Sequence, residues 1–185
     1  MSLSPDVSLN KRIFSEKIQF RGHPNILGTH RNTLEITKDE EISKRADCII
    51  GVKASKGCSD LDPRILTHIN SGGKLEFEIT VGNLSFHFTG FGFPDLELSD
   101  PREIVLRKSD FLSPRTLAIG CDAAAVDVPR EIIHLLSDPA TIGTIQISAQ
   151  EAPETVEPSV GLNALEVLAK NDSYSKYSAG LNGRE

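Results

Sequence analysis

The segment KLEFEITVGNLSFHFTGFG, residues 74–92, constrains the fold most, because two alternating strands flank a two-residue loop signal. If Gly82 and Asn83 form a hairpin loop, every apolar side chain on one face meets an apolar partner. The apolar pairs are then Val81–Leu84, Ile79–Phe86 and Phe77–Phe88, and the polar pairs are Thr80–Ser85 and Glu78–His87. A slip of one residue would mix the two faces. The sequence therefore predicts an antiparallel hairpin with this register.

Other alternating or apolar segments predict further strands at 14–20, 29–37, 48–54, 102–109, 115–121 and 141–148. Residues 62–73 predict a short helix capped by Asp62, with Ile65, Leu66 and Ile69 on its buried side. Residues 128–138 predict a second helix, with Asp127 as its cap and a core stripe of Ile132, Leu135 and Leu136. We expect an α+β domain on a largely antiparallel, strongly bent sheet or partial barrel of about seven strands with two short helices. We expect no internal repeat.

Composition changes near residue 150, and this change sets the predicted domain boundary. All eight phenylalanines lie before this position, whereas the last 35 residues are acidic and begin with a segment rich in Glu and Pro. Such a segment buries too little apolar surface to offset the entropy of ordering. We therefore predict one globular domain over residues 1–150 and a mostly flexible tail over residues 151–185.

The charge and cysteine content narrow the function classes. A net charge of −6 argues against a non-specific binder of nucleic acid or of an anionic membrane, although a local basic patch stays open. We find no apolar run of the length that a membrane span needs, and no signal peptide pattern. The three cysteines, Cys48, Cys58 and Cys121, lack CxxC spacing, which favours a cytoplasmic protein without a disulfide framework.

The first candidate site segment is GHPNILGTHRNTLEIT, residues 22–37, which contains His23 and His30. Histidine is the natural proton carrier near neutral pH, so acid–base chemistry or ligand binding is one interpretation. A metal site would need these histidines together with Glu35, Asp47 or Cys48, but the spacing matches no metal motif, and we assign no metal and no cofactor. The competing interpretation is structural, with His23 capping a turn and His30 hydrogen-bonded within a sheet.

The second candidate segment is LRKSDFLSPRT, residues 106–116, which concentrates polar side chains at a strand end and a turn. Three cations within nine residues are able to hold a phosphate or carboxylate. Ser-Asp before a turn is also ordinary turn chemistry, so structural capping is the alternative. The candidate binding residues are Arg107, Lys108, Ser109, Asp110 and Arg115, with Thr33 from the first segment.

Several segments resemble the archaeal domain-of-unknown-function family 371: GHPNILGTHRNTLEITKD, DCIIGVKA, IVLRKSDF, RTLAI and DAAAVDVPR. The resemblance runs from about Phe14 to Leu136 and leaves the tail outside. It implies an archaeal, cytoplasmic protein and includes the site residues named above, but the family has no assigned activity, so it implies no catalytic role. The SKGCSD segment around Cys58 departs from the family pattern.

We therefore hypothesise that the two polar segments converge on one cleft that takes an anionic metabolite or a nucleotide. His23 or His30 would move protons, Glu35 or Asp47 would orient the reacting groups, and Arg107, Lys108 and Arg115 would hold the anion. Whether the protein is an enzyme stays open at this point. The alternatives are an RNA- or nucleotide-binding surface with exposed aromatic residues, and a protein-interaction module without catalysis.

Overall fold

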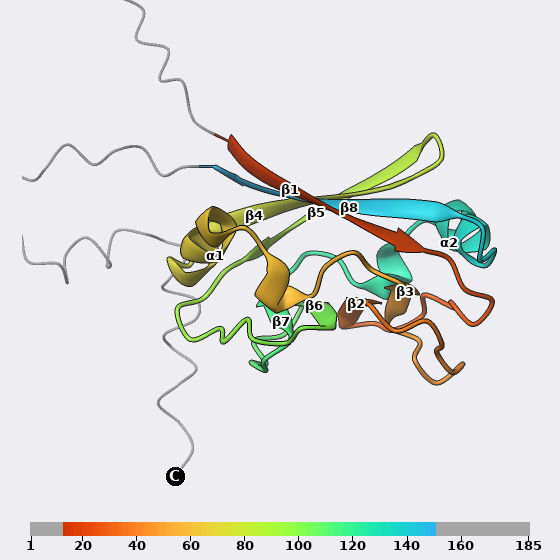
Figure 1. Ribbon diagram of the computed structural model, residues 1–185, viewed down its shortest axis with the longest axis horizontal. Helices are drawn as coiled ribbons and strands as arrows, with labels where there is room; N and C mark the ends of the chain where they lie inside the picture. Colours follow the sequence, from red (N-terminus) through yellow and green to blue (C-terminus); the bar gives the residue numbers. More distant parts are fainter. Residues whose placement is uncertain (1–12, 151–185) are drawn as a thin grey trace, which may run out of the picture. The chain divides into compact units, whose positions relative to one another are not determined.

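The computed structural model describes residues 13–150, which form two four-stranded sheets flanked by short helices. Sheet A has the strand order β1-β8-β4-β5, and sheet B has the order β3-β2-β6-β7. Figure 1 shows sheet A lying across sheet B, with the two α-helices near opposite ends of sheet A. The strands are β1 (Ile13–Arg21), β2 (Thr33–Thr37), β3 (Ile49–Gly51), β4 (Lys74–Val81), β5 (Leu84–Phe91), β6 (Glu103–Arg107), β7 (Thr116–Ala118) and β8 (Ile142–Gln150). The helices are η1 (Cys58–Asp60), α1 (Pro63–Asn70), η2 (Ala125–Asp127) and α2 (Arg130–Leu136).

The predicted fold class is confirmed, with eight described strands instead of about seven. Most strand pairs are antiparallel, but β2 pairs with β3, and β6 with β7, in parallel. Isolated bridges join Arg21 to Val52 and Phe91 to Ile119, so the edges of sheet A touch the chain beyond β3 and β7. Within the described residues the two sheets are not closed into a barrel, and the core lies between them.

The predicted hairpin is confirmed in every pair. β4 and β5 pair from Val81–Leu84 to Lys74–Phe91, and the register includes Glu78 opposite His87. These last two side chains form an ion pair at 3.7 Å when the histidine is protonated. The hairpin therefore follows from the alternating pattern and the Gly-Asn loop alone.

Both predicted α-helices are present, but only the predicted cap of α1 is confirmed. Asp62 caps α1 as expected, because its carboxylate accepts the backbone N–H of Arg64. The predicted cap of α2 is wrong: Pro129 occupies the cap position, and Asp127 belongs to η2. The predicted stripe of α2 is also wrong in one residue, because Ile133 is buried and Leu135 is 38% exposed.

The structure contains an internal repeat, contrary to the expectation from the sequence. Residues 13–81 and 84–150 each form three strands, a 3-10 helix, an α-helix and a last strand, in the same order. The details recur as well. Lys38 contacts Asp60 at 2.5 Å, and Lys108 contacts Asp127 at 2.6 Å. The repeat is therefore apparent from the order of the elements and from matching contacts.

The backbone contacts of the two halves align residue by residue. Val52 accepts the backbone N–H of Arg21, and Ile119 accepts that of Phe91. Asp39 accepts the N–H of Lys53, and Ser109 accepts that of Gly120. Gly22 and Gly92 each lie against the backbone at the end of an α-helix, where a Cβ would come within 2.2 Å and 2.0 Å of a carbonyl oxygen. These contacts define which positions correspond.

The predicted tail, residues 151–185, lies outside the described residues, and so do the first 12 residues of the predicted domain. Within residues 13–150, no helix has both the length and the apolar character required to cross a lipid bilayer.

Candidate functional site

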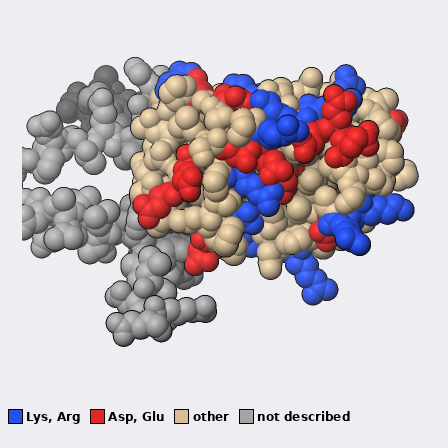
Figure 2. All heavy atoms as spheres, turned by 60° about the horizontal axis from the view of Figure 1, so that its bottom comes forward, with Lys and Arg blue, Asp and Glu red and all other residues tan. Residues whose placement is uncertain are grey.

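The central pair of sheet B carries polar side chains on the face turned away from the core. Leu34, Ile36, Ile104 and Leu106 point into the core and are almost fully buried. Because side chains alternate along a strand, the residues between them lie on the other face. There the facing pairs are Thr33–Arg107, Glu35–Val105 and Thr37–Glu103. Figure 2, which brings the sheet B side forward, shows acidic and basic side chains intermixed in the middle of this face.

Glu35 is the most buried acid of this face, at 3% exposure. Arg115 Nη1 lies 3.5 Å from each of its carboxylate oxygens, and the Cys48 thiol donates to Oε2 at 3.5 Å. Burial raises the pKa of Glu35 above 4.5, and the positive charge of Arg115 offsets only part of this effect. Burial, and then the charge of Glu35, raises the pKa of Cys48 to about 12, so the thiol is protonated and is not a nucleophile.

Two arginines lie beside this carboxyl group in different environments. Arg115 is also paired with Glu103, whose Oε2 lies 2.5 Å from Nη1. Arg107 instead has neutral partners. Its Nε donates to the Thr116 hydroxyl at 3.0 Å, its Nη2 lies 3.5 Å from the Ser113 hydroxyl, and its guanidinium lies 4.9 Å from the centre of the Phe111 ring.

The Arg107 guanidinium is half-buried and forms no ion pair with any of the described residues. Burial, together with the charge of Arg115, lowers its pKa from 12.5, and the negative charge of Glu35 offsets only part of this effect. A positive charge in this setting is poorly compensated by the surrounding protein. We call Glu35, Cys48, Glu103, Arg107, Arg115 and Thr116 the arginine–carboxylate cluster.

The structure brings the two predicted segments side by side, because β2 and β6 pair. Thr33 faces Arg107, and the carbonyl of Asn32 accepts the backbone N–H of Lys108 at 2.9 Å. His30 and Asp47 lie at the entrance to β2, where the Asp47 carbonyl accepts the N–H of His30. His30 Nδ1 accepts the N–H of Asn32 at 3.3 Å, which leaves Nε2 without a partner among the described residues.

The turn after β6 carries predicted binding residues that do not belong to the arginine–carboxylate cluster. The Lys108 ammonium is engaged with Asp127, and the matching pair Lys38–Asp60 in the first half indicates that this contact supports the fold. Asp127 and Asp60 each also accept a backbone N–H at 2.9 Å. Ser109 and Asp110 are exposed. Of the predicted cations, Arg107 and Arg115 therefore belong to the cluster, whereas Lys108 is used elsewhere.

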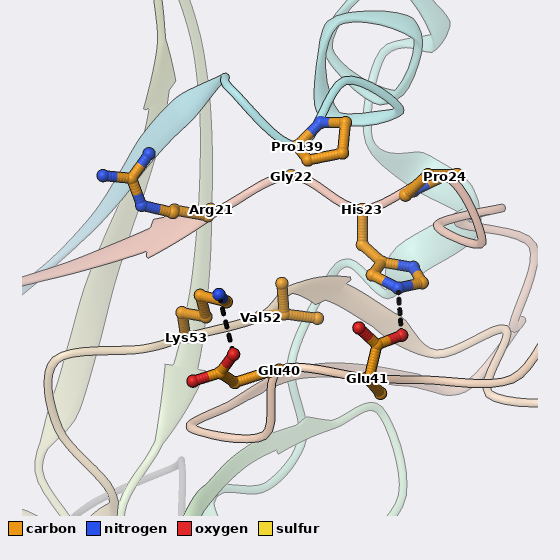
Figure 3. Close-up of a pocket in the computed structure, with 9 residues that line it drawn as sticks. All are labelled: Arg21, Gly22, His23, Pro24, Glu40, Glu41, Val52, Lys53 and Pro139. Atoms are coloured by element: carbon orange, nitrogen blue, oxygen red, sulfur yellow. Dashed lines mark hydrogen bonds and ion pairs between the residues drawn. The ribbon is translucent and has the colours of Figure 1, made fainter.

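His23 lies in a separate pocket of about 600 Å³ (Figure 3). Its Nδ1 accepts the N–H of Asn25 at 3.0 Å, and its Nε2 lies 3.3 Å from a carboxylate oxygen of Glu41. The side chain is thus anchored in a turn, as the structural interpretation expected, and none of its hydrogen bonds is to Glu35, Arg107 or Arg115. The other charged residues that line this pocket are Arg21, Glu40 and Lys53.

The arginine–carboxylate cluster is absent from the mirrored positions of the repeat. The residues that carry it differ in type from their counterparts: Glu35 corresponds to Val105, Arg107 to Thr37, Arg115 to Cys48 and Glu103 to Thr33. A fold that both halves adopt does not require a side chain that only one of two corresponding positions carries. The asymmetry therefore marks the cluster as a functional candidate.

Sequence reasoning missed four contributors to this site: Glu103, Ser113, Thr116 and Phe111. The register of β2 with β6 would have placed Glu103 on the same face as Glu35, but no turn links these two strands, so no local signal fixed that register. Within the described part of the chain, no three His, Cys, Asp or Glu side chains lie close enough together to hold a metal ion.

These observations define an α+β protein of two similar halves, with an arginine–carboxylate cluster where the halves meet. The chain belongs to the family described as a domain of unknown function, DUF371, which matches residues 18–150 and confirms the resemblance seen in the sequence. The uncharacterised protein MJ0206 of Methanocaldococcus jannaschii is 36% identical over 121 residues, which cover 65% of this chain and 90% of that protein.

Proposed function

We propose that the protein is a small enzyme or ligand-binding domain for an anionic metabolite, and that Arg107 and Arg115 hold its phosphate or carboxylate group. The observation that carries this proposal is the half-buried Arg107 guanidinium, which has hydroxyl and aromatic partners but no acidic partner among the described residues. A planar guanidinium matches phosphate and carboxylate groups with two parallel hydrogen bonds. A bound anion would supply the missing negative charge.

In this proposal Glu35 is the proton-carrying group. Its carboxyl is buried beside both arginines, and burial raises its pKa toward the range in which general acids work. His30 is the second candidate, because its Nε2 has no described partner. His23 is not a candidate for this role, because both of its ring nitrogens are engaged and it lies apart from the two arginines.

One observation favours a nucleotide as the form of the ligand. The Phe111 ring is 60% exposed and lies over the guanidinium of Arg107. An exposed aromatic ring next to an anion-binding arginine is suited to stacking a base while the arginine holds a phosphate. A nucleotide is therefore the second candidate ligand. Unlike a simple phosphate or carboxylate, it would stack its base on the Phe111 ring.

Calorimetric titration of the full chain tests both candidates. The probes are inorganic phosphate, pyrophosphate, citrate and adenosine monophosphate, measured against the wild-type protein and Arg107→Gln. We expect at least one probe to bind and the substitution to weaken it by about tenfold or more, which corresponds to about 1.4 kcal/mol. Arg45→Gln, a change at an exposed arginine, is the matched control and leaves the affinity unchanged.

A second variant separates the two candidates. If a base stacks on the ring, Phe111→Ala weakens the binding of adenosine monophosphate but leaves the affinity for phosphate unchanged. Equal affinities of the wild-type protein and Arg107→Gln for every probe, or a lack of binding by all four, would overturn the proposal.

A further inference from the structure

The pocket at His23 is lined by charged side chains of both signs. Arg21 and Lys53 supply two positive charges, and Glu40 and Glu41 supply two negative charges. Because His23 Nδ1 faces the N–H of Asn25, the imidazole proton lies on Nε2 and points to Glu41. The lining therefore carries equal numbers of positive and negative groups, and Lys53 and Glu40 are paired with each other.

The fold does not require the two positive charges of this pocket. Matching backbone contacts fix the second-half counterparts of three lining residues, and none of these counterparts is charged: Phe91 for Arg21, Phe93 for His23 and Gly120 for Lys53. The backbone contacts that fix these three correspondences recur in both halves. The positive charges of Arg21 and Lys53 are thus a feature of the first half that the shared architecture leaves free to vary.

Lys53 has an unusual backbone conformation for a residue with a side chain. Its backbone lies in the left-handed region at φ 50°, where a side chain is disfavoured, and its counterpart at φ 57° is a glycine. Residues in such conformations concentrate at functional sites. The Lys53 ammonium contacts the Glu40 carboxylate at 2.8 Å, and the Glu40 side chain is 71% exposed, so this partner is readily displaced.

The pocket walls are fixed in advance. Arg21 and Val52 exchange two backbone hydrogen bonds at 2.7 and 2.9 Å, and the N–H of Lys53 donates to Asp39. Gly22 lies against the backbone at Asp138, where a Cβ would come within 2.2 Å of the carbonyl oxygen. A ligand entering this pocket therefore meets positioned charges without first ordering the backbone.

We propose that this pocket binds a small zwitterion that carries one carboxylate and one ammonium group, of which free amino acids are the simplest class. In Figure 3 the side chains of Arg21 and Lys53 lie on one side, and those of His23 and Glu41 lie on the other. The carboxylate of the ligand contacts Arg21 and replaces Glu40 as the partner of Lys53. The ammonium group contacts Glu41. This site is separate from the arginine–carboxylate cluster and does not depend on the function proposed for it.

Calorimetric titration of the full chain with individual amino acids tests the proposal, together with the N-acetyl and decarboxylated forms of any amino acid that binds. We expect the intact zwitterion to bind and each modified form to bind about tenfold more weakly or worse, because each lacks one of the two charges. Detectable binding by no amino acid, or equal binding by the modified forms, would overturn the proposal.

Two variants locate the site. Lys53→Gly removes the ammonium group but suits the left-handed backbone, so we expect binding to be lost while the melting temperature does not fall. Glu41→Gln changes a side chain that is 90% exposed, so it leaves the fold intact and weakens binding through the ammonium group. Lys17→Ala, at an exposed position of β1, is the control and leaves affinity unchanged. Wild-type affinity in both pocket variants would show that the ligand binds elsewhere and would reject this assignment.

Discussion

Glu35 and Val105 face each other at the centre of the β2–β6 pair, and they are also corresponding residues of the two halves. The pseudo-twofold axis that relates the halves therefore passes between a buried carboxyl group and an apolar side chain. The paired backbone of β2 and β6 is thus related by this axis, whereas the side chains on the two sides of it differ in charge. Two arginines next to Glu35 extend this asymmetry into a charged site.

The first prediction concerns the pH dependence of stability. A carboxyl group whose pKa is raised on folding stabilises the folded state below its unfolded pKa, and this contribution is lost as the pH rises through the folded pKa. For Glu35 the loss begins near 4.5 and extends upward. We expect the melting temperature of the wild-type protein to fall relative to that of Glu35→Gln as the pH is raised from 4 to 7. A difference that is constant or of opposite sign would contradict the assigned direction.

The second prediction concerns the partner of that carboxyl group. Arg115→Met leaves Glu35 buried without its cation and also unpairs Glu103. We expect a loss of about 1–2 kcal/mol of unfolding free energy, at the lower end for buried polar groups because the Arg115 side chain is 40% exposed. The double variant Glu35→Gln with Arg115→Met recovers part of this loss. Chemical denaturation of the four proteins measures the coupling, and strictly additive effects would exclude a direct interaction.

The third prediction tests the internal repeat through Asp60 and Asp127. Each carboxylate accepts a backbone N–H at the start of a 3-10 helix and contacts a lysine. We expect Asp60→Ala and Asp127→Ala to reduce the unfolding free energy by similar amounts, about 1 kcal/mol each. Neither change affects binding at the arginine–carboxylate cluster. If one variant were strongly destabilised and the other unaffected, the two contacts would not be structural equivalents.

The fourth prediction concerns the close approach at Gly22 and Gly92. An added Cβ would meet backbone carbonyl oxygens at 2.2 and 2.0 Å, and backbone is unable to move aside as a flexible side chain does. We expect Gly22→Ala and Gly92→Ala each to cost about 3 kcal/mol, the upper part of the range for overpacking. Thermal denaturation measures this, with Ser85→Ala on the exposed face of β5 as the control. Near-native melting temperatures would show that the helix ends can shift.

Local sequence patterns predicted the features that depend on neighbouring residues. The β4–β5 hairpin and the α1 cap both follow from residues a few positions apart, and both are confirmed. The cap of α2 and one of the three residues of its predicted stripe were wrong, because Asp127 is used by η2 and Lys108 and because Ile133 is buried in place of Leu135. Tertiary contacts decided both points.

Long-range relationships were harder to predict. The proximity of the segments around Thr33 and Arg107 was hypothesised from composition, whereas the pairing of β2 with β6 that produces it has no local signal. The repeat was missed because its halves share contacts more than residue types, as Arg21 and Phe91 illustrate. The separation of His23 from the cluster likewise depends on the direction in which the chain leaves β1, which spacing alone does not fix.

The strand order of sheet A has a consequence for how such a chain assembles. β1 and β4 belong to the first half, and β5 and β8 to the second, so each ladder in the order β1-β8-β4-β5 joins strands from different halves. One half in isolation would leave its share of this sheet without any hydrogen-bonded neighbour. A protein made of a single half would therefore need a second copy of itself to complete this sheet, whereas a chain that contains both halves completes it alone and lets each half carry different charges.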